Sequence, residues 1–297
     1  MTRILLTGRR GQVGFELQRA LAPLGRVTAL DRQECDLADP EAIRAMVRDV
    51  QPDIIVNPAA YTAVDKAESE PELAAAINAI APAIIGEEAR KLGALLVHYS
   101  TDYVFDGLQH ASYKEGDAPN PQSIYGRTKL AGELALAASG AKHLILRTSW
   151  VVGAHGGNFA KTILRLAAER DSLNVVADQH GAPTSAALLA DVTAQLLGRF
   201  LQQRDGFPLG LYHVAAAGET HWQAYANHVV HRAREAGVAL RLAPEAIHPI
   251  ATAEYPTAAR RPPNSRLDTH KLRDTFGLHL PDWQLGLDHI LEQILKP

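Results

Sequence analysis

A predicted strand at residues 4–7 contains the apolar run Ile-Leu-Leu, and it leads through Thr7 directly into Gly8, Gly11 and Gly14. The run is typical of a buried strand, and the apolar side chains of residues 13–24 fall on one face of a predicted helix. A strand, a glycine turn and a helix let the backbone approach a pyrophosphate, whose charge meets N–H groups at the helix N-terminus. Because the spacing is GxxGxxG rather than GxGxxG, the prediction of a dinucleotide site depends on the flanking strand and helix as well as on the glycines.

The same alternation of strand and helix continues through the first half of the chain. Apolar runs predict further strands at residues 27–30, 53–57, 95–99 and 144–147. Apolar side chains at helical spacing predict helices near residues 43–47, 73–84 and 125–138. Pro82 either starts a new helix or kinks one. Strict alternation implies a parallel sheet with helices on both faces, so the predicted fold is an α/β, Rossmann-type doubly wound sheet.

The regularity weakens after about residue 150. Helical stretches follow near residues 159–169, 187–201, 222–236 and 283–295, separated by segments rich in proline or glycine. We therefore predict an NAD(P)-binding Rossmann domain over residues 1–150 and a smaller C-terminal substrate-binding lobe over residues 151–297. Some segments of the second half are expected to return to the first domain.

Composition and charge exclude several other functions. With 297 residues, 46% of them hydrophobic, the chain can bury a sizeable core. A formal net charge of -3 without a basic block argues against nucleic acid or an anionic membrane as partner. The single Cys35 excludes an internal disulfide, and Thr7 breaks the first apolar run at once, unlike a signal peptide or membrane span. We expect a cytoplasmic protein with no nucleic acid and no membrane partner.

Charged residues around the second predicted strand bear on the choice of cofactor. Asp31, at the end of that strand, can accept hydrogen bonds from an adenosine ribose, which favours NADH. Arg32 follows at once, and Arg9 and Arg10 lie in the glycine loop, where a guanidinium could neutralise the 2′-phosphate of NADPH. The alternative is that each arginine is a solvated surface charge. The sequence therefore predicts NADPH or NADH without choosing between them.

A tyrosine, a lysine and a threonine form the predicted catalytic group. Tyr125 and Lys129 are four residues apart, so on a helix they lie on one face. A phenol with a pKa of about 10 is a poor acid at neutral pH until a neighbouring ammonium stabilises the phenolate, and Lys129 can do this while holding the nicotinamide ribose. Thr101 ends a predicted strand, where its hydroxyl can bridge Tyr125 and a substrate carbonyl. The alternative is an exposed helical pair, and the glycine loop upstream argues against it.

Further segments extend these motifs into a family resemblance, and they lie at residues 11–17, 63–68, 100–107, 125–133, 147–150 and 261–265. Two examples are Ser-Thr-Asp-Tyr-Val-Phe-Asp-Gly at residues 100–107 and Tyr-Gly-Arg-Thr-Lys at residues 125–129. Through them the chain resembles the extended short-chain dehydrogenase/reductases and, within that superfamily, the family of dTDP-4-dehydrorhamnose reductases. The resemblance runs essentially from end to end.

This resemblance implies a nucleotide-sugar biosynthetic oxidoreductase that reduces the C4 carbonyl of dTDP-4-dehydro-L-rhamnose to give dTDP-L-rhamnose. Tyr125 would be the proton donor, Lys129 would lower its pKa, and Thr101 would tune the hydrogen bond. In similar proteins an Asp-Leu pair borders the adenine. The residues implied to bind the cofactor are Gly8, Gly11, Gln12, Val13, Gly14, Asp31, Arg32, Asp36, Leu37, Ala59, Ala60, Tyr61, Tyr99, Tyr125 and Lys129. Those implied to bind the dTDP-sugar are Thr101, Asp102, Trp150 and Arg261.

Two of the substrate residues have simpler alternatives. Trp150 could be a core aromatic, although its place just after a strand end favours a platform for a sugar or base. Arg261 could be a solvated charge in a proline-rich loop, but a diphosphate needs a cationic partner and a planar guanidinium suits it.

Three other functions are alternatives to the reductase: a dehydratase, a non-catalytic subunit and an epimerase. Dehydratases of the same superfamily carry Asp-Glu after the catalytic threonine, whereas Tyr103 follows Asp102 here, so the acid-base pair for removing water is incomplete. The regulatory β subunit of methionine adenosyltransferase also resembles this family, which makes a non-catalytic subunit the principal alternative. A sugar-nucleotide epimerase, which recycles tightly held NAD, is another. Intact Thr101, Tyr125 and Lys129 favour the reductase.

Metal binding and oligomeric state depend on acidic residues. Thirteen histidines show no closed cluster, since His228 and His231 have helical spacing but lack a third ligand. Some members of the family are described as magnesium-linked dimers, and Glu16 matches one of their acidic positions. Ala187 stands where related chains can have glutamate, so one carboxylate is missing. We expect a monomer or homodimer and no metal site, with Glu16 a ligand only if a magnesium-linked dimer forms.

Overall fold

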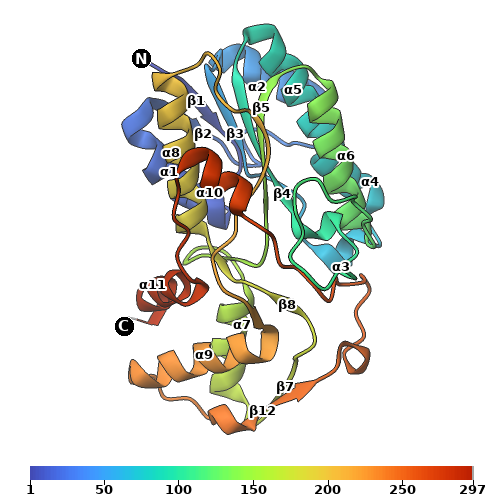
Figure 1. Cartoon of the computed structure of the whole chain (residues 1–297), viewed down its shortest axis with the longest axis vertical. Coiled ribbons are helices and arrows are strands. Elements are labelled where there is room, and N and C mark those ends of the chain that lie inside the picture. Colours follow the sequence, from blue (N-terminus) through green and yellow to red (C-terminus); the bar gives the residue numbers. More distant parts are fainter. Residues whose placement is uncertain (296–297) are drawn as a thin grey trace.

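The computed structural model describes residues 1–295, and its centre is a sheet of six strands in the order β10-β5-β4-β3-β1-β2. The strands are β1 (Arg3–Leu6), β2 (Arg26–Ala29), β3 (Ile54–Asn57), β4 (Leu95–Thr101), β5 (Lys142–Thr148) and β10 (Gly210–His213). All neighbours in this sheet are parallel. Because the strand order steps outward from β1 in both directions, the predicted doubly wound Rossmann-type sheet is confirmed (Figure 1).

Helices cover both faces of the sheet. One layer contains α1 (Gln12–Leu21), α8 (Ala186–Gln202) and α10 (His270–Phe276). The other contains α2 (Pro40–Val50), α5 (Ala81–Leu92) and α6 (Ile124–Ala138). Successive strand side chains point to opposite faces, so Leu6 packs in the first layer and Leu5 in the second. This burial on both sides explains why the strands are continuous apolar runs.

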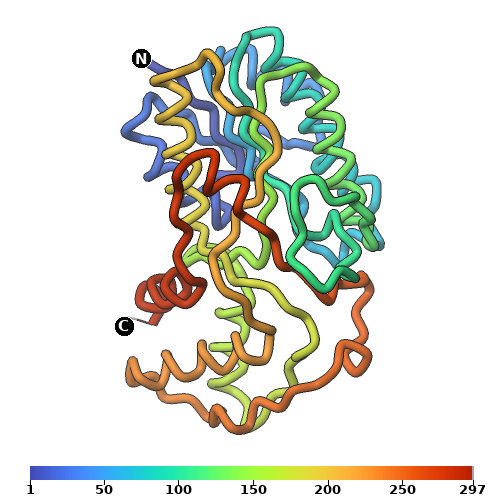
Figure 2. The backbone as a smooth tube through the Cα atoms, in the orientation of Figure 1, coloured from blue at the N-terminus to red at the C-terminus, as the bar shows by residue number. Residues whose placement is uncertain are grey.

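The chain beyond residue 150 builds a smaller lobe and also returns to the sheet. The lobe contains α7 (Phe159–Glu169), α9 (Trp222–Glu235), α11 (Trp283–Leu295) and the parallel strands β7 (Leu173–Val176) and β12 (Ile247–Ile250). Two short ladders join β6 (Val151–Val152) to β9 (Thr184–Ser185) and β8 (His180–Gly181) to β11 (Thr220–His221). Between the lobe elements the chain supplies α8, β10 and α10 to the sheet and its helical cover (Figure 2).

Two elements differ from the sequence prediction. Residues 210–213 form the edge strand β10, which the apolar pattern did not predict because the run Gly-Leu-Tyr-His is short and only partly buried. The helix expected near residues 73–84 is divided into α4 (Pro71–Ala75), a π-helical turn (Ala76–Ile80) and α5. The helical backbone continues unbroken from residue 71 to residue 92, so Pro82 does not begin a separate helix. It lies two residues after the π-helical turn, which interrupts the regular i→i−4 ladder just before it.

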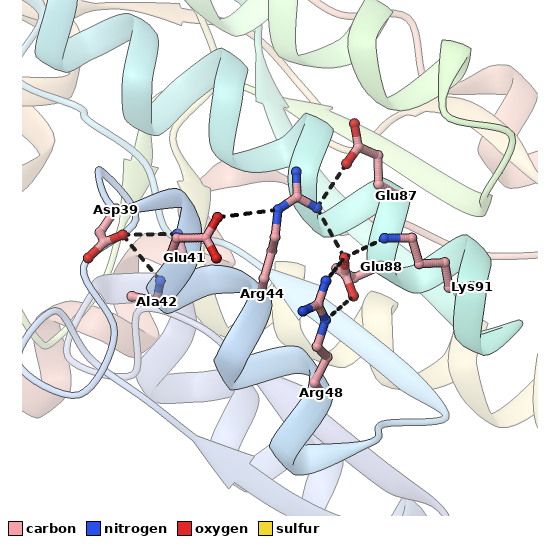
Figure 3. A network of polar contacts seen from close by, with 8 residues as sticks. All are labelled: Asp39, Glu41, Ala42, Arg44, Arg48, Glu87, Glu88 and Lys91. Carbon is pink, nitrogen blue, oxygen red and sulfur yellow. Dashed lines mark hydrogen bonds and ion pairs between the residues drawn. The ribbon is translucent and has the colours of Figure 1, made fainter.

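A network of ion pairs joins α2 to α5 (Figure 3). The buried carboxylate of Glu88 accepts hydrogen bonds from Arg48 at 3.0 and 3.1 Å, from Arg44 at 3.0 Å and from Lys91 at 2.7 Å. Hydrogen bonding to Arg48 is the largest effect, and with the other cations it holds the pKa of Glu88 at about 2 in spite of burial. The carboxylate is therefore charged at neutral pH and ties the two helices together.

Glu88→Gln should lower the free energy of unfolding at neutral pH by roughly 1–2 kcal/mol, because the amide keeps the shape and loses the charge. The folded pKa of Glu88 lies below its ordinary value of 4.5, so this stabilisation is present above that pH and is lost as the pH falls toward 2. Urea unfolding at about pH 7 and about pH 3 measures it. Glu87→Gln, which removes one exposed partner of Arg44, is the control and should cost less. A deficit for Glu88→Gln that stays constant in acid would contradict the assignment.

Candidate active site

A cavity of about 860 Å³ opens over the carboxyl ends of the strands, where parallel sheets bind ligands. Its lining includes these residues predicted to bind the cofactor: Gly8, Gly11, Gln12, Val13, Gly14, Asp31, Arg32, Ala59, Ala60, Tyr99, Tyr125 and Lys129. A smaller cavity of about 140 Å³ shares part of this lining and adds Asp36 and Leu37. The structure thus brings the glycine loop and the Tyr125–Lys129 pair to one cleft, with a side pocket of suitable composition for an adenine.

Two positions of the glycine loop have no room for a side chain, so the loop packs closely against itself and against Ala59. Gly8 has a φ of 64°, in the left-handed region, and a Cβ there would lie 2.9 Å from the Ala59 side chain. A Cβ on Gly14 would lie 2.1 Å from the Gly8 carbonyl oxygen. Helix α1 starts after Gly11 with no side-chain cap, so its first N–H groups are available to an anion. These features fit the diphosphate of a nicotinamide dinucleotide.

The acidic residue at the end of β2 is held by arginines of the glycine loop. Asp31 lies 2.7 Å from Nε of Arg10 and 3.3 Å from a terminal nitrogen of Arg9. The backbone N–H of Gln33 is the largest influence lowering the pKa of Asp31, and the two arginines add to it. Arg32 instead lies 3.4 Å from Asp36, and its side chain is 73% exposed. Arg10 and Arg32 therefore flank Asp31 at the cavity, whereas sequence reasoning emphasised Arg32.

The phenol of Tyr125 lies in the first turn of α6, which the side chain of Ser123 caps by accepting a hydrogen bond from Gly126 at 3.1 Å. Burial is the largest effect on Tyr125 and raises its pKa well above the ordinary value, while hydrogen bonding to Thr101 opposes it. The hydroxyl of Thr101 donates to Asp102 at 3.0 Å and caps the turn η3 (Asp102–Val104).

The ammonium of Lys129 donates to the backbone carbonyl of Tyr99 at 2.7 Å and lies 3.2 Å from Nε2 of His98. Burial lowers the pKa of Lys129 to about 8. Within residues 1–295 no hydrogen bond joins Lys129 to the phenol of Tyr125. Burial is the largest effect on the pKa of both groups, and the role of Lys129 in stabilising the phenolate of Tyr125 stays a prediction.

Two tyrosines predicted at the cofactor differ in their placement. Tyr99 lines the cavity, and its buried hydroxyl lies 2.5 Å from that of Thr193. Tyr61 is not among the residues that line either cavity described above. Its phenol donates to Glu70 at 2.6 Å, and its backbone N–H donates to Asn78 at 2.8 Å. Ala59 and Ala60, just before it, line both cavities.

Of the residues predicted to bind substrate, Thr101 ends β4, Asp102 follows it, and Trp150 comes just after β5. None of these three is among the residues that line the cavities described here. Asp102 is buried, which raises its pKa to about 6 against the opposing effects of Ser265 and Thr101. Trp150 has a φ of 48° and stacks on Trp222, with ring centroids 3.7 Å apart. A non-glycine residue in this region of φ is strained, so the stacked ring is held by its surroundings rather than by local preference.

Arg261 lies at the edge of a third cavity, of about 370 Å³, in the lobe. Its guanidinium pairs with Asp65 at 2.6 Å and donates to the phenol of Tyr103 at 3.2 Å. Sequence reasoning missed the aromatic residues of this cavity, which are Phe159, Trp222 and Tyr255. These residues stand at the starts of two predicted helices and in the proline-rich segment before Arg261. Those positions did not indicate a binding cavity, because aromatic residues at such places more often belong to a core.

Glu16 is buried on α1, and its carboxylate lies 3.5 Å from Arg19, which also pairs with Asp191 at 3.0 Å. Among residues 1–295 there is no group of three or more side chains placed to hold a metal ion. The charged partner of Glu16 is therefore the guanidinium of Arg19.

In the part of the chain that the structure describes, no helix has both the length and the apolar character needed to cross a membrane.

A Rossmann-type sheet, a glycine cradle and a Tyr-Lys pair in one cleft define a nicotinamide-dependent oxidoreductase of the extended short-chain dehydrogenase/reductase class. The profile of the family described as RmlD substrate binding domain matches residues 1–296, and the chain belongs to that family.

Named relatives agree with this assignment. The chain is 52% identical to the dTDP-4-dehydrorhamnose reductase of Escherichia coli K12, over 98% of this chain and 97% of that one. It is 50% identical to the enzyme of the same name from Salmonella typhimurium, with the same coverage. A crystal structure of dTDP-4-dehydrorhamnose reductase from Bacillus anthracis in complex with NADP superposes with a TM-score of 0.88 at 34% identity, covering 98% of this chain and 99% of that one.

Proposed function

We propose that this chain reduces dTDP-4-dehydro-L-rhamnose to dTDP-L-rhamnose with NADPH or NADH. The observation that carries the proposal is the placement of Tyr125 and Lys129 in the same cavity as the glycine cradle. Identity of about half with two reductases of this name supports the choice of substrate. The dehydratase alternative lacks the glutamate it needs, because Tyr103 follows Asp102.

The reaction adds a hydride and a proton across one carbonyl group. When bound, the cofactor supplies the hydride that adds to C4 of the sugar. Tyr125 gives its phenolic proton to the carbonyl oxygen, which becomes a hydroxyl group. Burial keeps the phenol protonated until negative charge develops on the substrate, and the Lys129 ammonium then stabilises the phenolate that remains. The hydroxyl of Thr101 orients the phenol by hydrogen bonding.

The substrate would lie across the junction of sheet and lobe. Asp102, which follows Thr101, and Trp150, which follows β5, are proposed to contact the sugar. Trp222, Tyr255 and Arg261 line the lobe cavity, where the two aromatic rings are proposed to contact a thymine and Arg261 the diphosphate. Arg261 would exchange or share its present partner Asp65 when it binds that anion.

The direct test is oxidation of NADPH and of NADH, followed by absorbance, with enzymatically made dTDP-4-dehydro-L-rhamnose. Stoichiometric formation of dTDP-L-rhamnose is expected. No turnover, together with capture of a methionine adenosyltransferase from a pull-down, would favour a regulatory subunit. Purification with stoichiometric NAD that is not consumed would favour an epimerase. A cytoplasmic location and a monomeric or homodimeric state belong to the same proposal, and cell fractionation and light scattering would test them.

Arg32→Ala should lower kcat/KM for NADPH by about 3- to 10-fold and change kcat/KM for NADH by less than about twofold. The reason is that only NADPH presents a 2′-phosphate to the guanidinium. The measurement is the ratio of kcat/KM for the two cofactors. Arg10→Ala is the matched comparison, since Arg10 also lines the cavity and pairs with Asp31. Equal losses for both cofactors in Arg32→Ala would show that Arg32 is structural, and a shifted ratio only in Arg10→Ala would transfer the phosphate role to Arg10.

A further inference from the structure

Four polar side chains from different elements form a buried chain that ends at the catalytic lysine. The ammonium of Lys129, on α6, lies 3.2 Å from Nε2 of His98, on β4. Nδ1 of His98 lies 3.2 Å from the amide nitrogen of Asn57, on β3, and the hydroxyl of Thr7 donates to the amide oxygen of Asn57 at 2.6 Å. None of the four is more than 3% exposed. Since buried polar groups are costly unless paired, the hydrogen bonds in this row are a specific arrangement rather than a by-product of packing.

The partners of Lys129 are neutral, although a carboxylate is close in sequence. Glu133, one turn further along α6, is engaged by Arg147 through two hydrogen bonds of 2.8 and 2.6 Å. The lysine therefore donates to the carbonyl of Tyr99 and to His98. An ammonium has three N–H donors, so two are used inside the protein and the third is available toward the cavity that Lys129 lines.

The same contacts determine the state of His98. Burial first, and then the charge of Lys129, lowers the pKa of His98 well below its ordinary value, so the imidazole is neutral. An ammonium has only donors, so Nε2 carries the lone pair and Nδ1 carries the proton. Because Nδ1–H and the amide nitrogen of Asn57 are both donors, their approach at 3.2 Å is a packing contact and not a hydrogen bond. A second positive charge at this point would repel Lys129, so the neutral state of His98 keeps the ammonium in place.

We propose that His98 is a positioning residue that fixes the Lys129 ammonium with a neutral acceptor, while Asn57, to which Thr7 donates from the start of the glycine loop, packs against the other side of the ring. The inference rests on the proposed reductase function for its meaning, but its tests do not require turnover. Its consequence is that the histidine sets where the ammonium lies and over what pH range it stays charged.

The charged and titratable groups near Lys129 come from four elements. They are Tyr125 and Glu133 on α6, His98 on β4, Arg147 on β5, and Asp102 and Tyr103 on η3. Asp102 and Tyr103 act on Tyr125, and Glu133 opposes the lowering of the lysine pKa by burial. A substitution at His98 leaves all the others in place, so a change in the pH dependence reports on the contact between His98 and Lys129.

The first test compares His98→Leu with His98→Gln by the dissociation constant for NADPH, measured by fluorescence without sugar nucleotide from about pH 6 to about pH 10. His98→Leu removes the acceptor, so affinity should fall about 10-fold and its decline at high pH should begin at a lower pH. His98→Gln offers a carbonyl oxygen and should recover most of the affinity and of the pH profile. An unchanged affinity and profile in His98→Leu, or equal impairment in both variants, would overturn the proposal.

A second test uses the unmodified protein and so does not depend on how the variants fold. In ¹⁵N-histidine NMR spectra of the NADPH-free chain at neutral pH, His98 should be neutral, with its proton on Nδ1. A protonated ring at neutral pH, or the opposite tautomer, would overturn the proposal. Failure of the reductase assay with these spectra as expected would count against the proposed function alone.

Discussion

Tyr125→Phe is expected to lower kcat by about 10²-fold or more while NADPH affinity stays within about twofold of wild type. The substitution removes the proton donor and keeps the ring that packs in the first turn of α6. Burial favours the protonated phenol, so Tyr125 can serve as the acid. The substitution therefore removes the only group proposed to protonate the substrate oxygen. The measurement is steady-state turnover with dTDP-4-dehydro-L-rhamnose beside cofactor titration.

Tyr212→Phe is the matched control for Tyr125→Phe. Tyr212 lies on the edge strand β10, and its buried hydroxyl donates to the backbone carbonyl of Pro208 at 2.9 Å, so the same atom is removed away from the proposed reaction. This variant should keep its turnover. Turnover at the wild-type level in Tyr125→Phe would refute the assigned acid.

Lys129→Met should damage both catalysis and cofactor binding, because one ammonium is proposed to serve the phenolate and the nicotinamide ribose. We expect kcat/KM to fall by about 10²- to 10³-fold and NADPH affinity by about 10-fold. In the wild type, kcat/KM should decline as the pH rises through about 8, where the buried ammonium loses its proton. This decline should be absent from the residual activity of the variant.

The control for Lys129→Met is Arg127→Met, which removes an exposed cation from the same helix and should leave both quantities near wild type. Unchanged NADPH affinity in Lys129→Met would remove the ribose role. An unshifted pH profile would remove the role in stabilising the phenolate, even if turnover is low.

The fold was largely predictable because its strands are buried on both faces and its turns need particular residues. The backbone at Gly8 requires a positive φ, and Gly14 touches a carbonyl oxygen, so the glycine spacing contains geometric information. Edge strand β10 was missed because a short, partly exposed run has no periodicity to detect. The π-helical turn before α5 likewise has no distinct apolar pattern.

The candidate site was predictable where its residues belong to one segment of the sequence. It was not predictable where residues from several segments come into contact only in the folded chain. The spacing of Tyr125 and Lys129 places them on one helix face, but the partner of the ammonium, His98, depends on how α6 packs over β4. The sequence did not show which arginine lies beside Asp31, because the contact of Arg10 with Asp31 depends on the folded shape of the glycine loop. The aromatic wall of the lobe cavity was also hidden, since Trp222 and Tyr255 are far apart in the sequence.

The return of the chain from the lobe to the sheet has a consequence for how the protein is made. During synthesis, β1 to β5 leave the ribosome long before β10 and α10, which end at residues 213 and 276. Until then an edge of the sheet and part of one apolar face lack their native cover. The sheet and its helical cover are therefore complete only after α7, α9 and β12 of the lobe have been made, so the two halves mature together.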